Sequence, residues 1–244
     1  MTAMHTPPEP AADLLWTLVV PLKPLPRAKT RLAADVPAPL RERLALAFAQ
    51  DTVAVALSCP EVLDVVVVTD DADAAGALRS LGAGILADRP GGGLNAALSY
   101  GAEEARRTRP RAPVAALNAD LPALRVTELS RVLRNAGHFS RSFLADAAET
   151  GTTFLAAGPE TELRPLFGGR SRFRHRASGA RELELPDVPS ARQDVDTADD
   201  LRAALALGVG PFTRRVTERL QDRGGPAGAD DLPKDDGADC PAGA

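Results

Sequence analysis

Three aspartates are the side chains in this sequence with the clearest capacity for chemistry. Asp120 follows the short apolar run 114–117, whose composition predicts a buried strand. Asp194 and Asp196 are two residues apart, so in an extended segment both carboxylates point to the same side, roughly 7 Å apart. Carboxylates near phosphates suit Mg²⁺, and these three residues are therefore candidate Mg²⁺ ligands. The spacing alone leaves open that residues 194–200 are only the acidic start of a helix.

A basic segment follows the apolar run 14–22. It contains four cations and three prolines: Lys23, Arg27, Lys29 and Arg31, with Pro21, Pro24 and Pro26. Each proline removes a backbone donor and restrains the residue before it, so we expect a stiff loop that is neither strand nor helix. The carboxyl end of the first strand is where α/β folds bind ligands. We interpret the segment as a phosphate-binding loop; a solvated basic turn is the alternative.

The glycine run Gly91-Gly92-Gly93 precedes Leu94 and Asn95 at the start of an expected helix. Free backbone amides at such a place can approach a phosphate or a ribose, with help from the helix dipole. The run fits neither the dinucleotide-binding nor the P-loop pattern. It is a candidate nucleotide contact, and a plain turn is equally compatible with it.

Residues 163–181 carry six arginines and His175, interrupted by glycine and serine. We expect a flexible basic loop that closes on an anionic substrate, with a solvated charged surface as the alternative. The Gly168 amide and the Ser171 hydroxyl are the donors expected for a carboxylate, together with Thr152 and Thr153 from the preceding turn. A structural or capping role suits His175 better than that of a catalytic base.

The elements that must position these residues alternate along the chain. Apolar patterns predict strands at 14–22, 62–69, 85–87, 114–117, 143–146, 153–157 and 182–185. Helices are expected at 39–57, at a short segment ending at residue 81, at 94–107, at 126–135 and at 198–207, the last with Thr197 as N-cap. The order of strands and helices, with short connections, predicts an α/β fold with one doubly wound, mostly parallel sheet.

Composition limits the function classes. The 244 residues are 44% hydrophobic and 25% charged, which is typical of a soluble globular protein. We expect one domain at 13–211 between disordered tails at 1–12 and 212–244. Residues 224–244 hold five aspartates and one lysine, so the net charge of −4 resides in the tail. A neutral body argues against nucleic-acid binding, and no apolar run suggests a membrane span.

Two cysteines, Cys59 and Cys240, are all that the chain contains. Cys240 lies in the polar tail, which argues against a structural disulfide and fits a cytoplasmic location. The three histidines are not spaced beside a cysteine, so a zinc site is poorly supported.

Seven short motifs occur in a characteristic order: PLKPLPRAKTRL, VVVVTDD, GGGLNAAL, NADLP, GTTFLAA, FGGRSRFRH and QDVDT. In this order they resemble the guanylyltransferases of coenzyme F420 biosynthesis, which have a nucleotide-diphospho-sugar transferase-like α/β fold. The resemblance spans residues 16–207. The composition looks like that of high-GC bacterial versions, which are taken to use phosphoenolpyruvate, whereas archaeal relatives use 2-phospho-L-lactate.

The resemblance implies transfer of GMP from GTP to the phosphate of a three-carbon phospho-acid, with release of pyrophosphate. It also implies the residue roles. Asp120, Asp194 and Asp196 would hold Mg²⁺; Thr152, Gly168 and Ser171 would hold the acceptor carboxylate; Lys23, Lys29 and Arg31 would steady the triphosphate; Gly92, Gly93 and Asn95 would contact the nucleotide. Of these, Lys23, Arg31 and Asp120 are expected to act in catalysis. Related enzymes carry a GxGxR loop where this chain has prolines and Lys23, which weakens the transfer of their phosphate contacts.

Alternatives remain at this point. Another nucleotidyltransferase of the same fold would act on a sugar phosphate or a molybdopterin-type cofactor, and a second class is a non-catalytic nucleotide-binding domain. Three aspartates arranged to clamp a metal favour an enzyme. The resemblance further implies product hand-off to the next F420 pathway enzyme. Oligomeric state and the identity of the acceptor acid are left open by the sequence.

Overall fold

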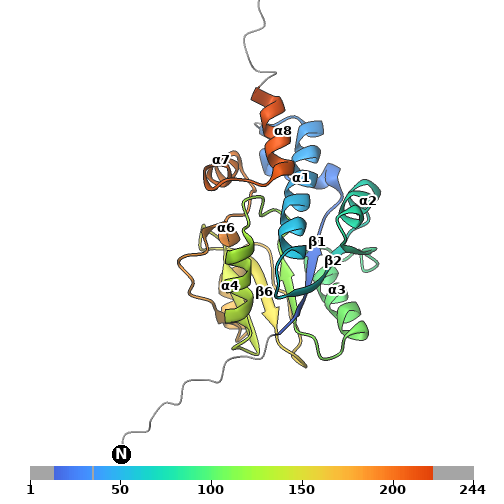
Figure 1. The fold of residues 1–244 in the computed structure, drawn as a ribbon, viewed down its shortest axis with the longest axis vertical. Helices are drawn as coiled ribbons and strands as arrows, with labels where there is room; N and C mark the ends of the chain where they lie inside the picture. Colours follow the sequence, from blue (N-terminus) through green and yellow to red (C-terminus); the bar gives the residue numbers. More distant parts are fainter. Residues whose placement is uncertain (1–13, 35, 222–244) are drawn as a thin grey trace, which may run out of the picture.

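A seven-stranded sheet forms the centre of the molecule (Figure 1). The computed structural model describes residues 14–34 and 36–221. In space the strands follow the order β3-β2-β1-β4-β6-β5-β7, and β6 is antiparallel to both of its neighbours. This confirms the expected mostly parallel sheet. The strands are β1 (Trp16–Pro21), β2 (Val62–Val68), β3 (Gly84–Leu86), β4 (Val114–Leu117), β5 (Arg141–Ala145), β6 (Thr152–Ala157) and β7 (Arg181–Glu182).

Helices cover both faces of the sheet (Figure 1). The α-helices are α1 (Ala38–Leu57), α2 (Ala72–Ser80), α3 (Leu94–Thr108), α4 (Val126–Ala136), α5 (Ser171–Ala177), α6 (Pro189–Arg192), α7 (Ala198–Leu207) and α8 (Pro211–Gln221). Two 3₁₀ turns, η1 (Leu25–Arg27) and η2 (Thr30–Ala34), follow β1. Among the described residues, none of the helices has both the length and the apolar character that a bilayer crossing requires.

The alternation of side chains along β1 explains the two layers. Leu18 and Val20 are buried on the face covered by α1, α2 and α4, whereas Val19 is buried on the face covered by α3. Helix α3 approaches the sheet closely at Gly101, where an added Cβ would lie 2.5 Å from a Val19 methyl carbon. Because both faces are covered, the central strands are apolar throughout rather than alternating with polar residues.

The strand directions determine which loops meet. Strands β1, β2 and β4 are parallel, so their carboxyl ends lie at one edge of the sheet. The hairpin of β5 and β6 brings the end of β5 and the start of β6 to the same edge, because β6 is antiparallel to β4 and to β5. The basic segment after β1, Asp120 after β4 and Thr152 at the start of β6 therefore share one edge.

The carboxyl boundary expected for the domain is wrong. The composition predicts a disordered tail from residue 212, but α8 occupies Pro211–Gln221 and lies beside α1 (Figure 1). The buried Asp51 carboxylate in α1 accepts the Phe212 and Thr213 N–H groups at 3.0 and 2.8 Å, and burial raises the pKa of Asp51. The low apolar content of residues 211–221 did not predict a helix, because the hydrogen bonds that hold its first turn come from Asp51, which is distant in the sequence. The expected tail at 1–12 and the remainder of the expected tail at 212–244, from residue 222 onward, lie outside the described residues.

Two segments expected as irregular loops contain helical turns. The basic segment after β1 includes η1 and η2. Pro26 is tolerated within η1 because the N–H groups of a first turn have no partner inside the turn and the φ angle of proline suits it. The segment 163–181 includes α5, and the strand expected after it is reduced to Arg181–Glu182.

His175 attaches α5 to the sheet. Its ring is fully buried and lies 5.7 Å from the Phe143 ring and 5.1 Å from the Phe167 ring, measured between centroids. Burial, reinforced by the positive charges of Arg141 and Arg174, lowers the pKa of His175 to about 4. The histidine therefore has the structural role that the sequence favoured.

Asp51 provides a test of how α8 is held. Replacing Asp51 with Ala leaves two helix N–H groups without their acceptor, and we expect a loss of roughly 1–3 kcal/mol in the free energy of unfolding, measured by urea denaturation. Asp187→Ala is the control, because it removes an exposed carboxylate that pairs with Arg131. Equal effects of the two substitutions would contradict the role given to Asp51.

The lowered pKa of His175 predicts a pH-dependent contribution to stability. The ordinary pKa of about 6.5 in the unfolded chain lies above the folded value, so the unfolded state binds the proton more readily. The stabilisation from the neutral ring is fully present above pH 6.5 and is lost as the pH falls towards 4. Wild type should therefore lose its advantage over His175→Gln across this range, as followed by thermal unfolding; an advantage that grows as the pH falls would contradict this.

Candidate functional site

A cavity of about 520 Å³ lies at the edge of the sheet where the loops after β1, β4 and β5 meet. Most of the residues selected from the sequence line it, although they come from distant parts of the chain. These are Lys23, Lys29, Arg31, Asp120, Thr152, Gly168, Ser171, Asp194 and Asp196. Arg27, Asn118, Asp146, Phe167 and Gly169 also contribute.

The three aspartates are brought together by backbone contacts. The Val195 N–H donates to the Asp120 carbonyl at 3.0 Å, which fixes the 194–196 segment beside the loop after β4. Thr52 of α1 supports that loop, because its hydroxyl accepts the Leu121 N–H at 3.1 Å and lies 3.3 Å from the Ala119 carbonyl. The expected convergence of Asp120 with Asp194 and Asp196 is therefore observed.

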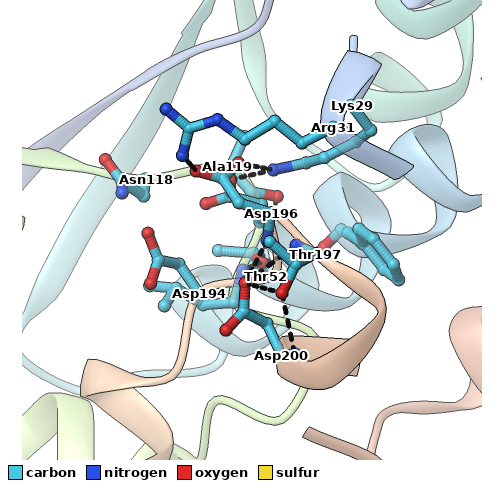
Figure 2. Close-up of polar contacts among 12 residues, drawn as sticks. Lys29, Arg31, Thr52, Asn118, Ala119, Asp194, Asp196, Thr197 and Asp200 are labelled. Atoms are coloured by element: carbon cyan, nitrogen blue, oxygen red, sulfur yellow. Dashed lines mark hydrogen bonds and ion pairs between the residues drawn. The ribbon is translucent and has the colours of Figure 1, made fainter. Parts of the chain in front are cut away.

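Asp200 orders the other end of the 194–196 segment. Its carboxylate accepts the N–H groups of Asp196 at 3.1 Å and Thr197 at 2.8 Å, and Thr197 caps α7 as predicted (Figure 2). Residues 194–200 therefore lead into the start of a helix, which was the alternative interpretation of their acidic character. The same residues also contribute to the site. Asp194 and Asp196 precede the helix and face the cavity, while Asp200 is used for the capping box.

Two cations of the basic segment reach towards these carboxylates (Figure 2). The Lys29 ammonium contacts both Asp120 and Asp196, the latter at 3.1 Å, and its side chain is 9% exposed. Arg31 lies 3.4 Å from Asp196 and is mostly exposed. Lys29 adopts a φ of 52°, a left-handed conformation that is uncommon outside glycine. Lys29 directly precedes the η2 turn, so the chain enters that turn through a left-handed residue.

The charges in this corner do not balance. Asp194 is half-buried beside Asp120, Asp196 and Asp146, with the Lys29 ammonium as the nearby opposing charge. Burial, reinforced by the neighbouring carboxylates, raises the pKa of Asp194 to about 8. Such repulsion is tolerated where a cation or a ligand relieves it.

The donor set suits a hard divalent cation. One oxygen of Asp120, Oδ1, is buried and has no hydrogen-bond partner, and carboxylates are the ligands that Mg²⁺ and Mn²⁺ accept. Within the part of the chain that the structure describes, no three acidic, histidine or cysteine side chains are already arranged around one point. Because Lys29 contacts both Asp120 and Asp196, binding of one ion by these two carboxylates requires the ammonium to move aside.

Thr152, Ser171 and Gly168 form the opposite wall. The Thr152 and Ser171 hydroxyls lie 3.1 Å apart, and Gly168 has a φ of 91°. Gly169, also with positive φ, continues the wall. The residues expected from the sequence to hold a carboxylate are therefore adjacent in space.

Asp146 is a residue of the site that is not among those expected from the sequence. Its carboxylate accepts the N–H groups of Thr150 and Gly151, both at 2.9 Å, and so shapes the turn that leads into Thr152. An added Cβ at Gly151 would lie 2.4 Å from an Asp146 oxygen, so the turn requires glycine there. The available signal was its position at the end of a strand, like that of Asp120, followed by a Gly-Thr turn.

Several expected residues do not line the cavity. Gly92 and Gly93 lie outside the lining, although the neighbouring Leu94 belongs to it. The Asn95 amide bonds instead to the Phe167 backbone, accepting its N–H at 2.8 Å and donating to its carbonyl at 3.2 Å. Thr153 is buried and donates to the Ala191 carbonyl at 2.8 Å.

The arginines of 163–181 also fail to line the cavity. Arg172 and Arg176 pair with Glu182, and Arg174 donates to the Phe167 carbonyl at 3.0 Å. These three arginines hold α5 and its loop in place, and closure of the basic side chains on a substrate stays a prediction. The segment contributes Gly168, Gly169 and Ser171 instead.

Comparison with curated proteins identifies close relatives. The chain is 64% identical over 205 residues to the phosphoenolpyruvate guanylyltransferase of Streptomyces coelicolor, covering 84% of this chain and 97% of that protein. It is 55% identical over 209 residues to the phosphoenolpyruvate guanylyltransferase of Thermomonospora curvata, covering 86% and 91%.

Solved structures with the same fold are more distant. A putative nucleotide-diphospho-sugar transferase from Desulfovibrio desulfuricans is 17% identical with a TM-score of 0.62, covering 85% of this chain and 94% of that one. A Mycobacterium tuberculosis protein solved in complex with manganese is 20% identical with a TM-score of 0.51, covering 79% and 98%. These similarities support the nucleotide-diphospho-sugar transferase-like fold.

The family model described as "Guanylyl transferase CofC like" matches residues 16–222. The match includes every site residue discussed above, and it includes α8, which the sequence analysis had assigned to a tail. The chain belongs to the CofC-like guanylyl transferase family.

Proposed function

We propose that this protein is a phosphoenolpyruvate guanylyltransferase of coenzyme F420 biosynthesis, which transfers GMP from GTP to the phosphate of phosphoenolpyruvate and releases pyrophosphate. The observation that carries the proposal is one cavity with cations of the segment after β1, four aspartates and a wall of hydroxyl donors. Family membership and the names of relatives at 64% and 55% identity support the same reaction.

We assign a divalent cation, with Mg²⁺ as the expected ion, to Asp120, Asp194 and Asp196. The unpaired Asp120 oxygen and the crowding of carboxylates around Asp194 support this assignment. When bound, such an ion would neutralise charge on the reacting phosphates. The manganese complex of the Mycobacterium tuberculosis relative is consistent with a divalent ion at this fold.

The cations of the basic segment serve the triphosphate in this proposal. Lys23 and Arg31 are exposed at the cavity, where both can reach phosphate oxygens, and Arg31 also lies 3.4 Å from the Asp196 carboxylate. Lys29 is buried against two carboxylates, so its first role is to offset their charge, and a contact with the nucleotide follows only if its ammonium leaves Asp120. Electrostatic stabilisation by these groups supplies much of the catalysis, since phosphoryl transfer depends mainly on positioning and charge.

The acceptor occupies the wall formed by Thr152, Gly168 and Ser171. The Thr152–Ser171 hydroxyl pair and the glycine backbone can donate hydrogen bonds to a carboxylate. The nucleotide contacts of Gly92, Gly93 and Asn95 stay predictions. For Asn95, a contact with the base requires its amide to leave the Phe167 backbone, so a role in holding the 163–170 loop fits its geometry better.

The chemistry needs no protein nucleophile. An oxygen of the acceptor phosphate forms a bond to the α-phosphorus of GTP, and the bond from that phosphorus to the bridging oxygen of the β-phosphate breaks. Pyrophosphate leaves with the electron pair. The residues of the chain hold the two anions in line and exclude alternative orientations, which converts a bimolecular encounter into a positioned reaction.

The reaction is tested by pyrophosphate release with GTP, Mg²⁺ and one acceptor at a time. We expect release with phosphoenolpyruvate and a product with the mass of the GMP adduct. Parallel reactions contain 2-phospho-L-lactate, 3-phosphoglycerate or a sugar phosphate, and ATP replaces GTP in a further set. Turnover with the sugar phosphate and none with any three-carbon acid would reject the proposal and favour another nucleotidyltransferase of this fold.

Asp194→Asn tests the metal assignment. Removing one carboxylate should reduce kcat at least about a hundredfold, in the range seen when charge-stabilising groups are lost. Thermal stability should stay equal or rise, because the substitution relieves repulsion from Asp120, Asp146 and Asp196.

The matched control is Asp199→Asn, at the exposed start of α7, where the carboxylate pairs only with Arg202 in the described contacts. It should leave both kcat and the unfolding temperature close to wild type. Near wild-type turnover of Asp194→Asn would remove this residue from the metal site.

A further inference from the structure

The buried ring of His175 lies behind the wall of the cavity that Thr152 and Ser171 form. Its Nδ1 is 3.0 Å from the Thr152 hydroxyl oxygen, and its Nε2 accepts the Leu166 backbone N–H at 2.9 Å. Packing against two phenylalanine rings fixes the plane of the imidazole. The two nitrogens therefore face different partners and do not exchange places.

These contacts determine which nitrogen carries the proton. The backbone N–H of Leu166 can only donate, so Nε2 of His175 must be unprotonated. The ring is neutral, because burial and two nearby arginines lower its pKa to about 4. Its single proton is consequently on Nδ1, and Nδ1–H donates to the Thr152 oxygen.

A count of protons shows what this means for the cavity. The Thr152 and Ser171 hydroxyls lie 3.1 Å apart and have one proton each. One proton lies in the bond between the two oxygens. Because Thr152 accepts a hydrogen bond from His175, neither hydroxyl proton is used in the contact with the imidazole. The second hydroxyl proton is therefore not used within the protein, and both Thr152 and Ser171 line the cavity. The pair can therefore offer one O–H to a ligand.

The other tautomer would reverse the outcome. If Nδ1 were unprotonated, Thr152 would donate to His175 and Ser171 would donate to Thr152. Both hydroxyl protons would then be used within the protein, and the pair would offer only lone pairs to the cavity. An anion would be repelled at that position. The tautomer of His175, which does not touch the ligand, therefore decides whether the hydroxyl pair attracts or repels an anion.

We propose that His175 is a positioning residue for the phospho-acid: by donating to Thr152, it makes the Thr152–Ser171 pair a hydrogen-bond donor towards an anionic ligand. The inference rests on the proposed function, in which this pair binds the acceptor carboxylate. A hydrogen-bond donor at this position favours a charged carboxylate over an amide or an ester, because those neutral groups are weaker acceptors.

The tautomer itself can be observed directly. The chain contains three histidines, so long-range ¹H–¹⁵N correlation spectra of the ¹⁵N-labelled protein, with His175→Gln for assignment, resolve the ring of interest. We expect a neutral ring at pH 7 with protonated Nδ1 and bare Nε2. A ring protonated on Nε2 alone would overturn the proposal, whatever the variants do.

Two substitutions separate the two hydrogen bonds of the ring. His175→Gln places an amide oxygen near the position of Nε2, which keeps an acceptor for Leu166 but removes the donor to Thr152. His175→Asn places an amide nitrogen near the position of Nδ1, which keeps that donor. Both lose the ring that packs on Phe143 and Phe167, so their unfolding temperatures should fall by similar amounts.

Kinetics should distinguish them. The KM for phosphoenolpyruvate should rise about tenfold in His175→Gln, because the Thr152 hydroxyl loses the donor that turns the free proton of the pair towards the ligand, and the KM for GTP should stay within a few-fold of wild type. His175→Asn should recover most of the affinity for phosphoenolpyruvate. An equal rise in both variants, or a rise in the KM for GTP of the same size, would mean that the ring is only structural.

The proposed function fails separately. If wild type releases no pyrophosphate with GTP and any three-carbon phospho-acid, the reaction assigned to the cavity is wrong before a variant is made. If wild type is active and His175→Gln binds phosphoenolpyruvate as wild type does, only the inference about His175 is wrong.

Discussion

The structure depends on holding several carboxylates together at one edge of the sheet despite their repulsion. Asp120, Asp194 and Asp196 come from two segments separated by more than seventy positions in the sequence, and the Val195–Asp120 backbone hydrogen bond joins those segments. Thr52 and Asp200 hold the two ends in place, and Lys29 offsets part of the charge. The free energy for this arrangement comes from the packed layers around it, as is usual where a site stores unfavourable electrostatics.

The two halves of the cavity are built by different means. On the aspartate side the positions are set by backbone hydrogen bonds and a helix cap, and charge is the dominant property. On the hydroxyl side Thr152 and Ser171 are set by the turn around Asp146 and by the buried ring of His175. Phosphoryl transfer needs both kinds of wall, since one must tolerate phosphate charge and the other must orient a small acid.

The strands and much of the cavity lining could be predicted from the sequence. The predictions that were wrong have physical causes. Apolar runs predicted the strands, and strand ends predicted the meeting of Asp120 with the basic segment, because parallel strands share a carboxyl edge. The contacts of Asn95 and of the arginines of 163–181 could not be predicted, since their hydrogen-bond partners are backbone groups and glutamates whose positions depend on the tertiary fold. Helix α8 was missed because Asp51, 160 residues earlier than its first turn, supplies the cap that its own sequence lacks.

The attachment of α8 has a consequence for the catalytic edge. The Gly210 N–H donates to the Pro122 carbonyl at 2.9 Å, two residues beyond Asp120, and an added Cβ at Gly210 would lie 2.3 Å from an Asp51 oxygen. Gly210 directly precedes α8, so this hydrogen bond attaches the start of the helix to the loop that carries Asp120, a candidate metal ligand. A chain cut before Gly210 would keep every residue of the cavity and yet lose a hydrogen bond that supports the loop carrying Asp120, so shortened versions for crystallisation should retain the segment to residue 221.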